Sequence, residues 1–166
     1  MENTNQVSPF KNRRLLIVLA LPVLAILWAL FRPELLFVNR TVNESLPPAA
    51  AVAAEPKALL TGSFTALAHQ TAGKAEVVEV GGKKFLRFTD FHTSNGPDVR
   101  VYLVAGADGK DNKTINAGNY LDLGTIKGNI GDQNYELPAD VDLARYRSVS
   151  IWCKRFAVNF GAANLM

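Results

Sequence analysis

The chain has little of several residue types on which familiar enzyme sites depend. Its 166 residues include one cysteine, Cys153, and two histidines, His69 and His92. A single cysteine cannot close a disulfide within its own chain, so no disulfide framework points to an oxidising compartment. The sequence also lacks a Walker-type glycine loop, a dinucleotide fingerprint, a His-Glu-x-x-His motif and a serine nucleophile elbow. These absences exclude the ordinary hydrolase and zinc-enzyme classes.

The net charge of +3 does not indicate a nucleic-acid partner. The first 32 residues hold four basic residues and one acidic residue, which account for the whole excess. The rest of the chain is neutral and offers no electrostatic footprint for a phosphate backbone. We therefore expect no nucleic-acid binding.

One long apolar run is present, and it predicts a transmembrane anchor at residues 15–31 that follows a cytoplasmic tail, residues 1–14. These seventeen residues carry no charge. At about 1.5 Å per residue they cover about 26 Å, the short end of a span of about 30 Å. A buried core helix would have no polar face at all. A cleaved signal peptide is a second alternative, although the nearest small-x-small site, Ala51 to Ala53, lies well beyond the run.

The flanking charges predict the orientation of this anchor. Lys11, Arg13 and Arg14 precede the run, whereas Arg32 and Arg40 follow it. The positive-inside rule then places the N-terminus in the cytoplasm and the C-terminal domain in the periplasm or outside the cell. Residues 32–57, rich in proline and alanine, show neither helical nor strand periodicity and predict a spacer.

Residues 58–166 are expected to form one all-β domain, antiparallel and β-sandwich-like, with a small barrel as the other architecture. Short apolar or alternating runs are separated by glycine, asparagine and proline, as in such domains. Only residues 141–147 hint at a helical turn. The eight expected strands are Leu60 to Ala66, Ala75 to Val80, Lys84 to Asp90, Val99 to Val104, Tyr120 to Ile126, Asn134 to Leu137, Ser148 to Cys153 and Phe156 to Phe160.

Three stretches hold more polar residues and glycines than plain strand connections need. They are residues 86–103, 123–138 and 149–165. The strings TSNGPD (93–98), GNIGDQNY (128–135) and IWC (151–153) occur in them in that order. Together these stretches resemble the DM-thirteen domain family, a small extracytoplasmic all-β module associated with electron transfer. The resemblance covers about residues 58–165.

This resemblance implies a sandwich-like fold and a redox role for the family cysteine, which corresponds to Cys153. It predicts a membrane-anchored redox accessory module, with another protein as its electron partner, rather than a stand-alone enzyme. The competing hypothesis is a non-catalytic binding or adhesion module that recognises a carbohydrate, a cation or an envelope protein.

The residues around Cys153 leave its role open. A free cysteine in an apolar strand usually packs as a small hydrophobic side chain. However, Lys154 and Arg155 follow directly, and cations beside a thiol favour the reactive thiolate. Packing and reactivity are both retained as hypotheses.

The metal hypothesis rests on His92 and Cys153, with His69 as a third ligand. Such a soft set would suit a copper or haem centre, although surface histidines are the simpler interpretation. No cofactor at all is the other expectation.

The polar loops offer a second candidate site. Asn95, Asp98 and Asp132 supply oxygen atoms of the kind that cations and sugars bind. The simpler interpretation of residues 93–98 is a turn, because Asn95-Gly96 permits positive φ and Pro97 restricts the next step.

Overall fold

The computed structural model describes residues 10–31, 38–47 and 56–166, and the chain divides into two units, residues 1–34 and 35–166. The first unit contributes one helix, α1 (Phe10–Phe31), which includes Pro22. Its large apolar side chains from Leu15 to Leu30 are exposed. This helix therefore takes no part in a hydrophobic core among the described residues.

The predicted transmembrane anchor at residues 15–31 is not supported. The run does form a helix, but no helix in the described parts of the chain is both long and apolar enough to cross a membrane.

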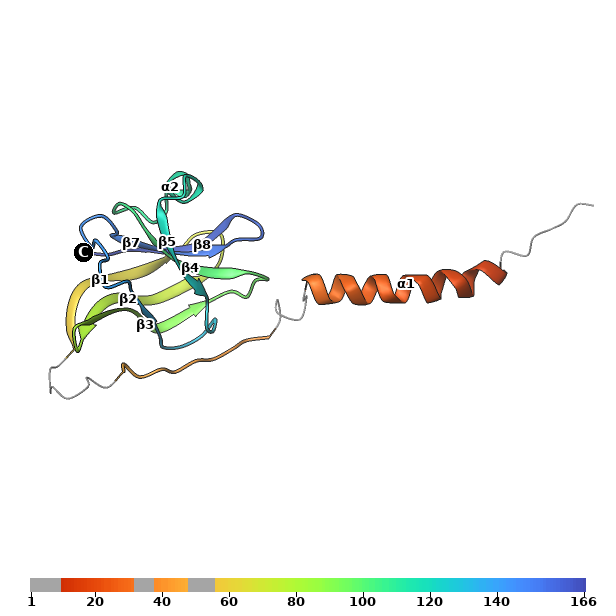
Figure 1. Ribbon diagram of the computed structural model, residues 1–166, viewed down its shortest axis with the longest axis horizontal. Coiled ribbons are helices and arrows are strands. Elements are labelled where there is room, and N and C mark those ends of the chain that lie inside the picture. The colour runs from red at the N-terminus through yellow and green to blue at the C-terminus, as the bar shows by residue number, and fades with distance from the viewer. Residues whose placement is uncertain (1–9, 32–37, 48–55) are drawn as a thin grey trace, which may run out of the picture. The chain divides into compact units, whose positions relative to one another are not determined.

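The described residues of the second unit form eight antiparallel strands and one short helix (Figure 1). Hydrogen bonding links the strands in the order β5-β4-β7-β8-β1-β2-β3-β6. The sequence predicted all eight strands, although the first or last residue of most strands differs from the prediction. The elements are β1 (Lys57–Ala66), β2 (Thr71–Val80), β3 (Lys83–Thr93), β4 (Val99–Val104), α2 (Asn112–Asn116), β5 (Tyr120–Thr125), β6 (Gln133–Glu136), β7 (Ser148–Cys153) and β8 (Val158–Asn164).

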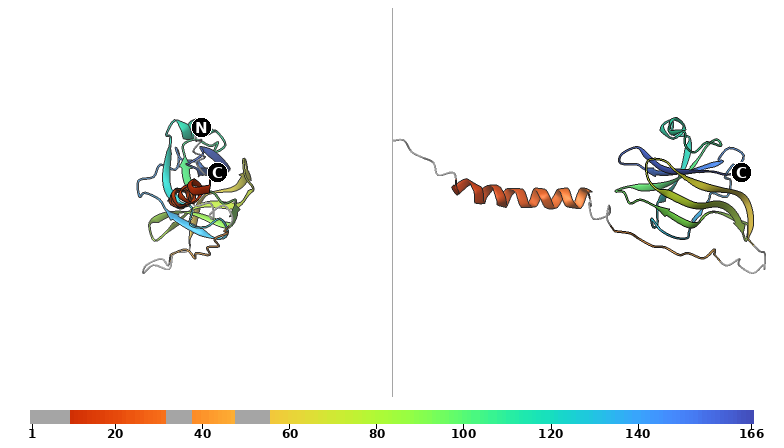
Figure 2. Two further views of the ribbon diagram at one scale, coloured as in Figure 1. Left: turned by 90° about the vertical axis from the view of Figure 1, so that its right-hand side faces the viewer. Right: turned by 180° about the vertical axis from the view of Figure 1, so that it is seen from behind.

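The strands form one nearly closed, barrel-like sheet rather than the predicted sandwich of two sheets (Figures 1 and 2). The all-β antiparallel class is confirmed. Strand β1 joins the two parts of the sheet, because Lys57 to Ser63 pair with β2 and Phe64 to Ala66 pair with β8. At the change of partner, Gly62 packs against the carbonyl oxygen of Asn164, where a Cβ atom would clash. One bent strand thus replaces the connection that would separate two sheets.

The interior of the barrel is filled with apolar side chains from seven of the eight strands. In β7, Val149, Ile151 and Cys153 face this core, as expected from the alternation of side chains along a strand. Trp152 faces the other side and joins a second cluster with Tyr102, Val104, Tyr120 and Ile115 of α2. Both faces of β7 are therefore buried, and its two buried serines, Ser148 and Ser150, are satisfied by hydrogen bonds to the Gly106 carbonyl oxygen and to Asn159 Oδ1.

The predicted spacer, residues 32–57, is partly folded onto the domain. Residues 39–46, here called the docked segment, lie beside the loop that precedes β6 (Figure 1). The Val42 N–H donates to Ile130 O at 2.9 Å, and the Glu44 N–H donates to Asp132 O at 2.9 Å. Val42, Glu44 and Leu46 are half-buried, whereas the residues between them are exposed. The domain accordingly begins before the predicted boundary at residue 58.

One ion pair fixes the centre of the docked segment. Lys127 Nζ lies 2.9 and 2.8 Å from the two carboxylate oxygens of Glu44. The Asn134 N–H donates to Glu44 Oε2 at 2.9 Å, and Arg87 Nη1 donates to the Glu44 carbonyl oxygen at 3.1 Å. Burial alone would raise the pKa of Glu44, but these hydrogen bonds and the charges of Lys127 and Arg87 lower it below its ordinary value of 4.5.

Two glycines allow the docked segment to approach the loop closely. A Cβ atom at Gly128 would lie 2.5 Å from the Arg40 carbonyl oxygen. Gly131 has φ +96°, and its Cβ atom would meet the carbonyl oxygen of Val42. Any larger residue at either position would push the segment away.

We expect Gly131→Ala to destabilise the domain by about 1 to 3 kcal/mol, because it adds both backbone strain and a clash with the docked segment. Chemical denaturation of the full chain would measure this loss. Gly124→Ala is the matched control, since Gly124 has φ +103° but no described atom within 4 Å of the Cβ position. Equal losses for the two variants would contradict the close contact.

Docking of the segment should also depend on pH. Because the folded-state pKa of Glu44 is lowered, its contribution is fully present above pH 4.5 and is lost as the pH falls through the lower folded value. We expect the hydrogen-exchange protection factors of the Val42 and Glu44 amides to fall below pH 4.5, while those of Thr61 and Met166, which bond each other, change less. In Glu44→Gln this difference between the two amide pairs should disappear. Its persistence would argue that another group controls docking.

Candidate functional site

The three unusual strings of the sequence meet at one end of the barrel. The Thr93 N–H donates to Asn129 O at 2.8 Å, and Asn129 Nδ2 donates back to Thr93 O at 3.2 Å. The Lys154 N–H donates to Asp98 O at 2.9 Å. Residues 93–98 therefore bridge the loop before β6 and the residue after Cys153, and this end of the barrel is the candidate site.

Cys153 lies at the end of β7 and is fully buried. Its register partners are Val99 of β4 and Val158 of β8, and it belongs to the main hydrophobic core. Lys154 and Arg155 are exposed, whereas the thiol faces the core. The arrangement in the folded state thus matches the packing hypothesis more closely than a thiolate held between two cations.

A loop and two rings close the barrel over this region. A Cβ atom at Gly96 would lie 2.7 Å from Val99 Cγ2 and 3.0 Å from Phe160 Cζ. The His69 ring packs against the same Phe160, with 3.8 Å between the ring centroids. Thr71 Oγ1 and Thr93 Oγ1, 2.9 Å apart, tie the β1–β2 turn to the start of the loop. Cys153 is fully buried, and its register partner Val99 is one of the residues against which Gly96 packs.

The predicted metal pair, His92 and Cys153, is not brought into one cluster. His92 is exposed on β3, whereas Cys153 faces the core. His69 belongs to the closure through Phe160, so it lies at the candidate end of the barrel. Among the described residues, no group of three or more His, Cys, Asp or Glu side chains is arranged to hold a metal ion. These residues do not fit the donor set of a copper centre.

The predicted binding-loop residues are already engaged within the protein. Asp98 pairs with Arg100 at 3.0 Å, and Arg100 also pairs with Asp122 at 3.0 Å. Asn95 Nδ2 donates to Asn39 Oδ1 at 3.0 Å. These contacts favour the structural role of the loop, because a ligand at Asp98 would have to compete with an arginine.

The Asp132 carboxylate is hydrogen-bonded to groups of β3 rather than open to a ligand. It accepts from Arg87 Nη2 at 2.8 Å and from the Asp90 N–H at 3.0 Å. Asp90 has φ +50°, an unusual value for a residue with a side chain. Asp132 thus holds this irregular part of β3 against the loop before β6.

Next to Asp132 in the sequence lies a buried polar pair, Gln133 and Tyr135, which the sequence did not identify as site residues. The Tyr135 hydroxyl donates to Gln133 Oε1 at 2.6 Å, and Gln133 Nε2 donates to the Gly128 carbonyl oxygen at 3.0 Å. Gln133 is fully buried, and burial raises the pKa of Tyr135. Their only signal in the sequence was the polar string 128–135. In the structure, these hydrogen bonds hold the loop before β6 in its conformation.

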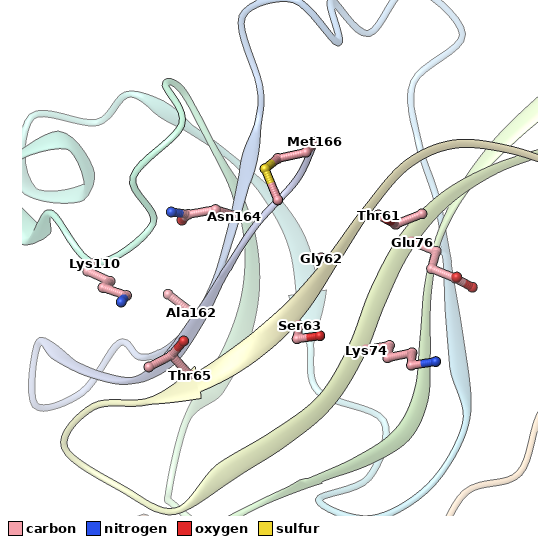
Figure 3. A pocket seen from close by; sticks show the side chains of 10 residues that line it. All are labelled: Thr61, Gly62, Ser63, Thr65, Lys74, Glu76, Lys110, Ala162, Asn164 and Met166. Carbon is pink, nitrogen blue, oxygen red and sulfur yellow. The ribbon is translucent and has the colours of Figure 1, made fainter.

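A separate concavity of about 470 Å³ lies on the outer face of β1, β2 and β8 (Figure 3). Hydroxyl groups of Thr61, Ser63 and Thr65 line it, and Lys74 and Lys110 lie on its opposite sides. None of the predicted site residues lines this concavity. It is therefore distinct from the end of the barrel that holds Cys153.

Comparison with known proteins agrees with the motif assignment. The family model described as electron transfer DM13 matches residues 63–165, which is more than half of the chain. No curated protein and no solved structure matches the chain. The matched range contains all three strings that meet at the candidate site, and the docked segment lies outside it. The chain belongs to the DM13 electron-transfer family.

Proposed function

We propose that this protein is a redox accessory module that exchanges electrons with a partner protein through Cys153. The observation that carries the proposal is the convergence of the three strings of the family region at the end of the barrel that holds the only sulfur nucleophile of the chain. Membership of an electron-transfer family supports the same chemistry. Location of the domain outside the cytoplasm stays a prediction from the sequence.

The chemistry open to a lone thiol is limited. In one balanced step, the Cys153 thiolate attacks a disulfide of the partner, and a mixed disulfide forms while the partner's own S–S bond breaks. Cys153 is oxidised, and the leaving sulfur of the partner is reduced and takes up a proton. No copper or haem step is proposed, because the residues around Cys153 do not provide further ligands for such a centre.

This chemistry requires the closure over Cys153 to open. The thiol is fully buried, so a partner disulfide has no path to its sulfur in the closed form. Residues 93–98 are the element to move, because they contact both Val99 and Phe160 through Gly96 and reach Lys154 through Asp98. Loops with few buried side chains open at lower free-energy cost than core strands.

A binding module remains the second candidate function, favoured by the concavity on β1, β2 and β8. Its hydroxyl groups suit a polar ligand, and its two lysines outnumber the single carboxylate of Glu76, which favours a ligand with a negative charge, such as an acidic sugar. This function requires no chemistry at Cys153. The behaviour of the thiol therefore discriminates between the two candidates.

We expect Gly96→Ala to raise the rate of Cys153 alkylation by iodoacetamide roughly tenfold, which corresponds to about 1.4 kcal/mol of loop opening. The added Cβ atom pushes the loop away from Val99 and Phe160. Gly106→Ala is the control, because it introduces strain at φ +86° without a described neighbour within 4 Å. An unchanged rate in a destabilised Gly96→Ala protein would contradict this route to the thiol.

The redox function itself is tested by incubating the full chain with glutathione disulfide under native conditions. We expect one mixed disulfide at Cys153, detected by mass spectrometry and reversed by dithiothreitol, and none in Cys153→Ser. Cys153→Ala should cost only about 1 to 2 kcal/mol of stability, so its fold remains available as a second control. A native thiol that reacts only after denaturation would reject the redox function and favour the binding module.

A further inference from the structure

The loop before β6 forms a groove that is built to accept an extended strand. The acceptor groove is defined here as residues 127–134 together with Arg87. Its two close-contact glycines leave room for a backbone, and its polar groups point at backbone atoms of the docked segment. Asn134 Nδ2 donates to Ser45 O at 2.9 Å, and Asn129 Oδ1 accepts from the Arg40 N–H at 2.7 Å.

The groove also selects for the side chains of its ligand. Its central cation, Lys127, makes a two-oxygen contact with the carboxylate of Glu44. Two residues further on, Leu46 packs against an apolar cluster of Val78, Val80 and Phe85. The ligand chemistry is therefore an extended strand with a carboxylate at its centre and an aliphatic side chain two residues later.

The docked segment is held less firmly than the barrel strands. None of its residues is fully buried, and its inward side chains are only half-buried. Its side-chain anchor is an ion pair in which Lys127 and Glu44 are 41% and 34% exposed. Contacts of this kind open at lower free energy than the core of a domain. The segment can therefore leave its groove while the barrel stays folded.

We propose that the acceptor groove is a strand-exchange site at which two copies of this chain associate, each binding residues 39–46 of the other. The segment of a second copy is the one peptide that matches the groove in every contact described above. Exchange replaces each intramolecular contact by an identical intermolecular one, so the association loses no bond. In a reciprocal pair of chains, both acceptor grooves are filled.

A mixture of two charge-reversed chains tests this exchange. In Glu44→Lys, two cations face each other within one chain, and in Lys127→Glu, two carboxylates do so. Exchange between the two variants restores an opposite-charge pair in both grooves. We expect a tagged Glu44→Lys chain to retain about tenfold more untagged Lys127→Glu chain than either variant retains of itself.

Two controls separate exchange from other association. Thr41→Lys places a lysine on the exposed side of the segment and keeps Glu44, so its mixture with Lys127→Glu should show only background retention. The double variant Glu44→Lys, Lys127→Glu restores the pair both within one chain and between two copies, so a tagged double variant should retain its untagged copy to the same extent as the unsubstituted chain retains its own. Retention that is equal in the complementary mixture and the Thr41→Lys mixture would overturn the proposal.

A peptide experiment covers the case in which Lys127→Glu does not fold. A fluorescent peptide of residues 38–47 should bind the full-length Glu44→Gln chain about tenfold more tightly than the unsubstituted chain, whose own segment competes for the groove. Fluorescence anisotropy measures both affinities. Absence of binding, or equal binding to both chains, would overturn the proposal. Neither experiment depends on the chemistry of Cys153.

Discussion

The apolar interior shared by the barrel strands is the constraint on which the other features depend. Seven strands contribute buried side chains to one core, and half-buried Leu121 and Leu123 of β5 pack against it, so the ends of the barrel must be sealed by loops that cannot themselves bury many apolar groups. Glycine and hydrogen-bonded polar residues form these seals. Because the strands fill the core and the loops seal its ends, the polar strings of the sequence lie at the barrel ends. The only thiol is buried by the same packing that stabilises the fold.

The strands could be predicted because their signals are local. Alternating side chains and glycine-rich breaks gave all eight strands, and Val99 to Val104 and Ser148 to Cys153 were predicted with the bounds found in the structure. The closed arrangement could not be predicted in the same way. It depends on the pairing of β1 with β8, almost a hundred residues apart, and on the close approach of Gly62 to the Asn164 carbonyl oxygen. The short helix α2 is too brief for its periodicity to be visible.

The sequence predicted which residues belong to the candidate site but not which residues they contact. The sequence singled out Cys153 and Asp98, but the burial of the thiol depends on Val99, Val158 and the loop around Gly96. Arg87, the partner of Asp132, comes from another strand. The docked segment was interpreted as part of a spacer because Val42, Glu44 and Leu46 form too short an alternation. Their partners lie far along the chain: Val78, Val80 and Phe85 are more than thirty residues from Leu46, and Lys127 is 83 residues from Glu44.

The docked segment also has a mechanical consequence. Tension applied to the chain from its N-terminal side reaches the segment before it reaches β1, because the segment precedes the barrel in sequence. Thr41 and Ile130 form a parallel bridge, and the neighbouring hydrogen bonds with Lys127–Glu44 would carry the first load. These contacts can rupture and re-form without disturbing the barrel hydrogen bonds. Under such tension the docked segment would detach from the loop before β6 before the strands of the barrel are pulled apart.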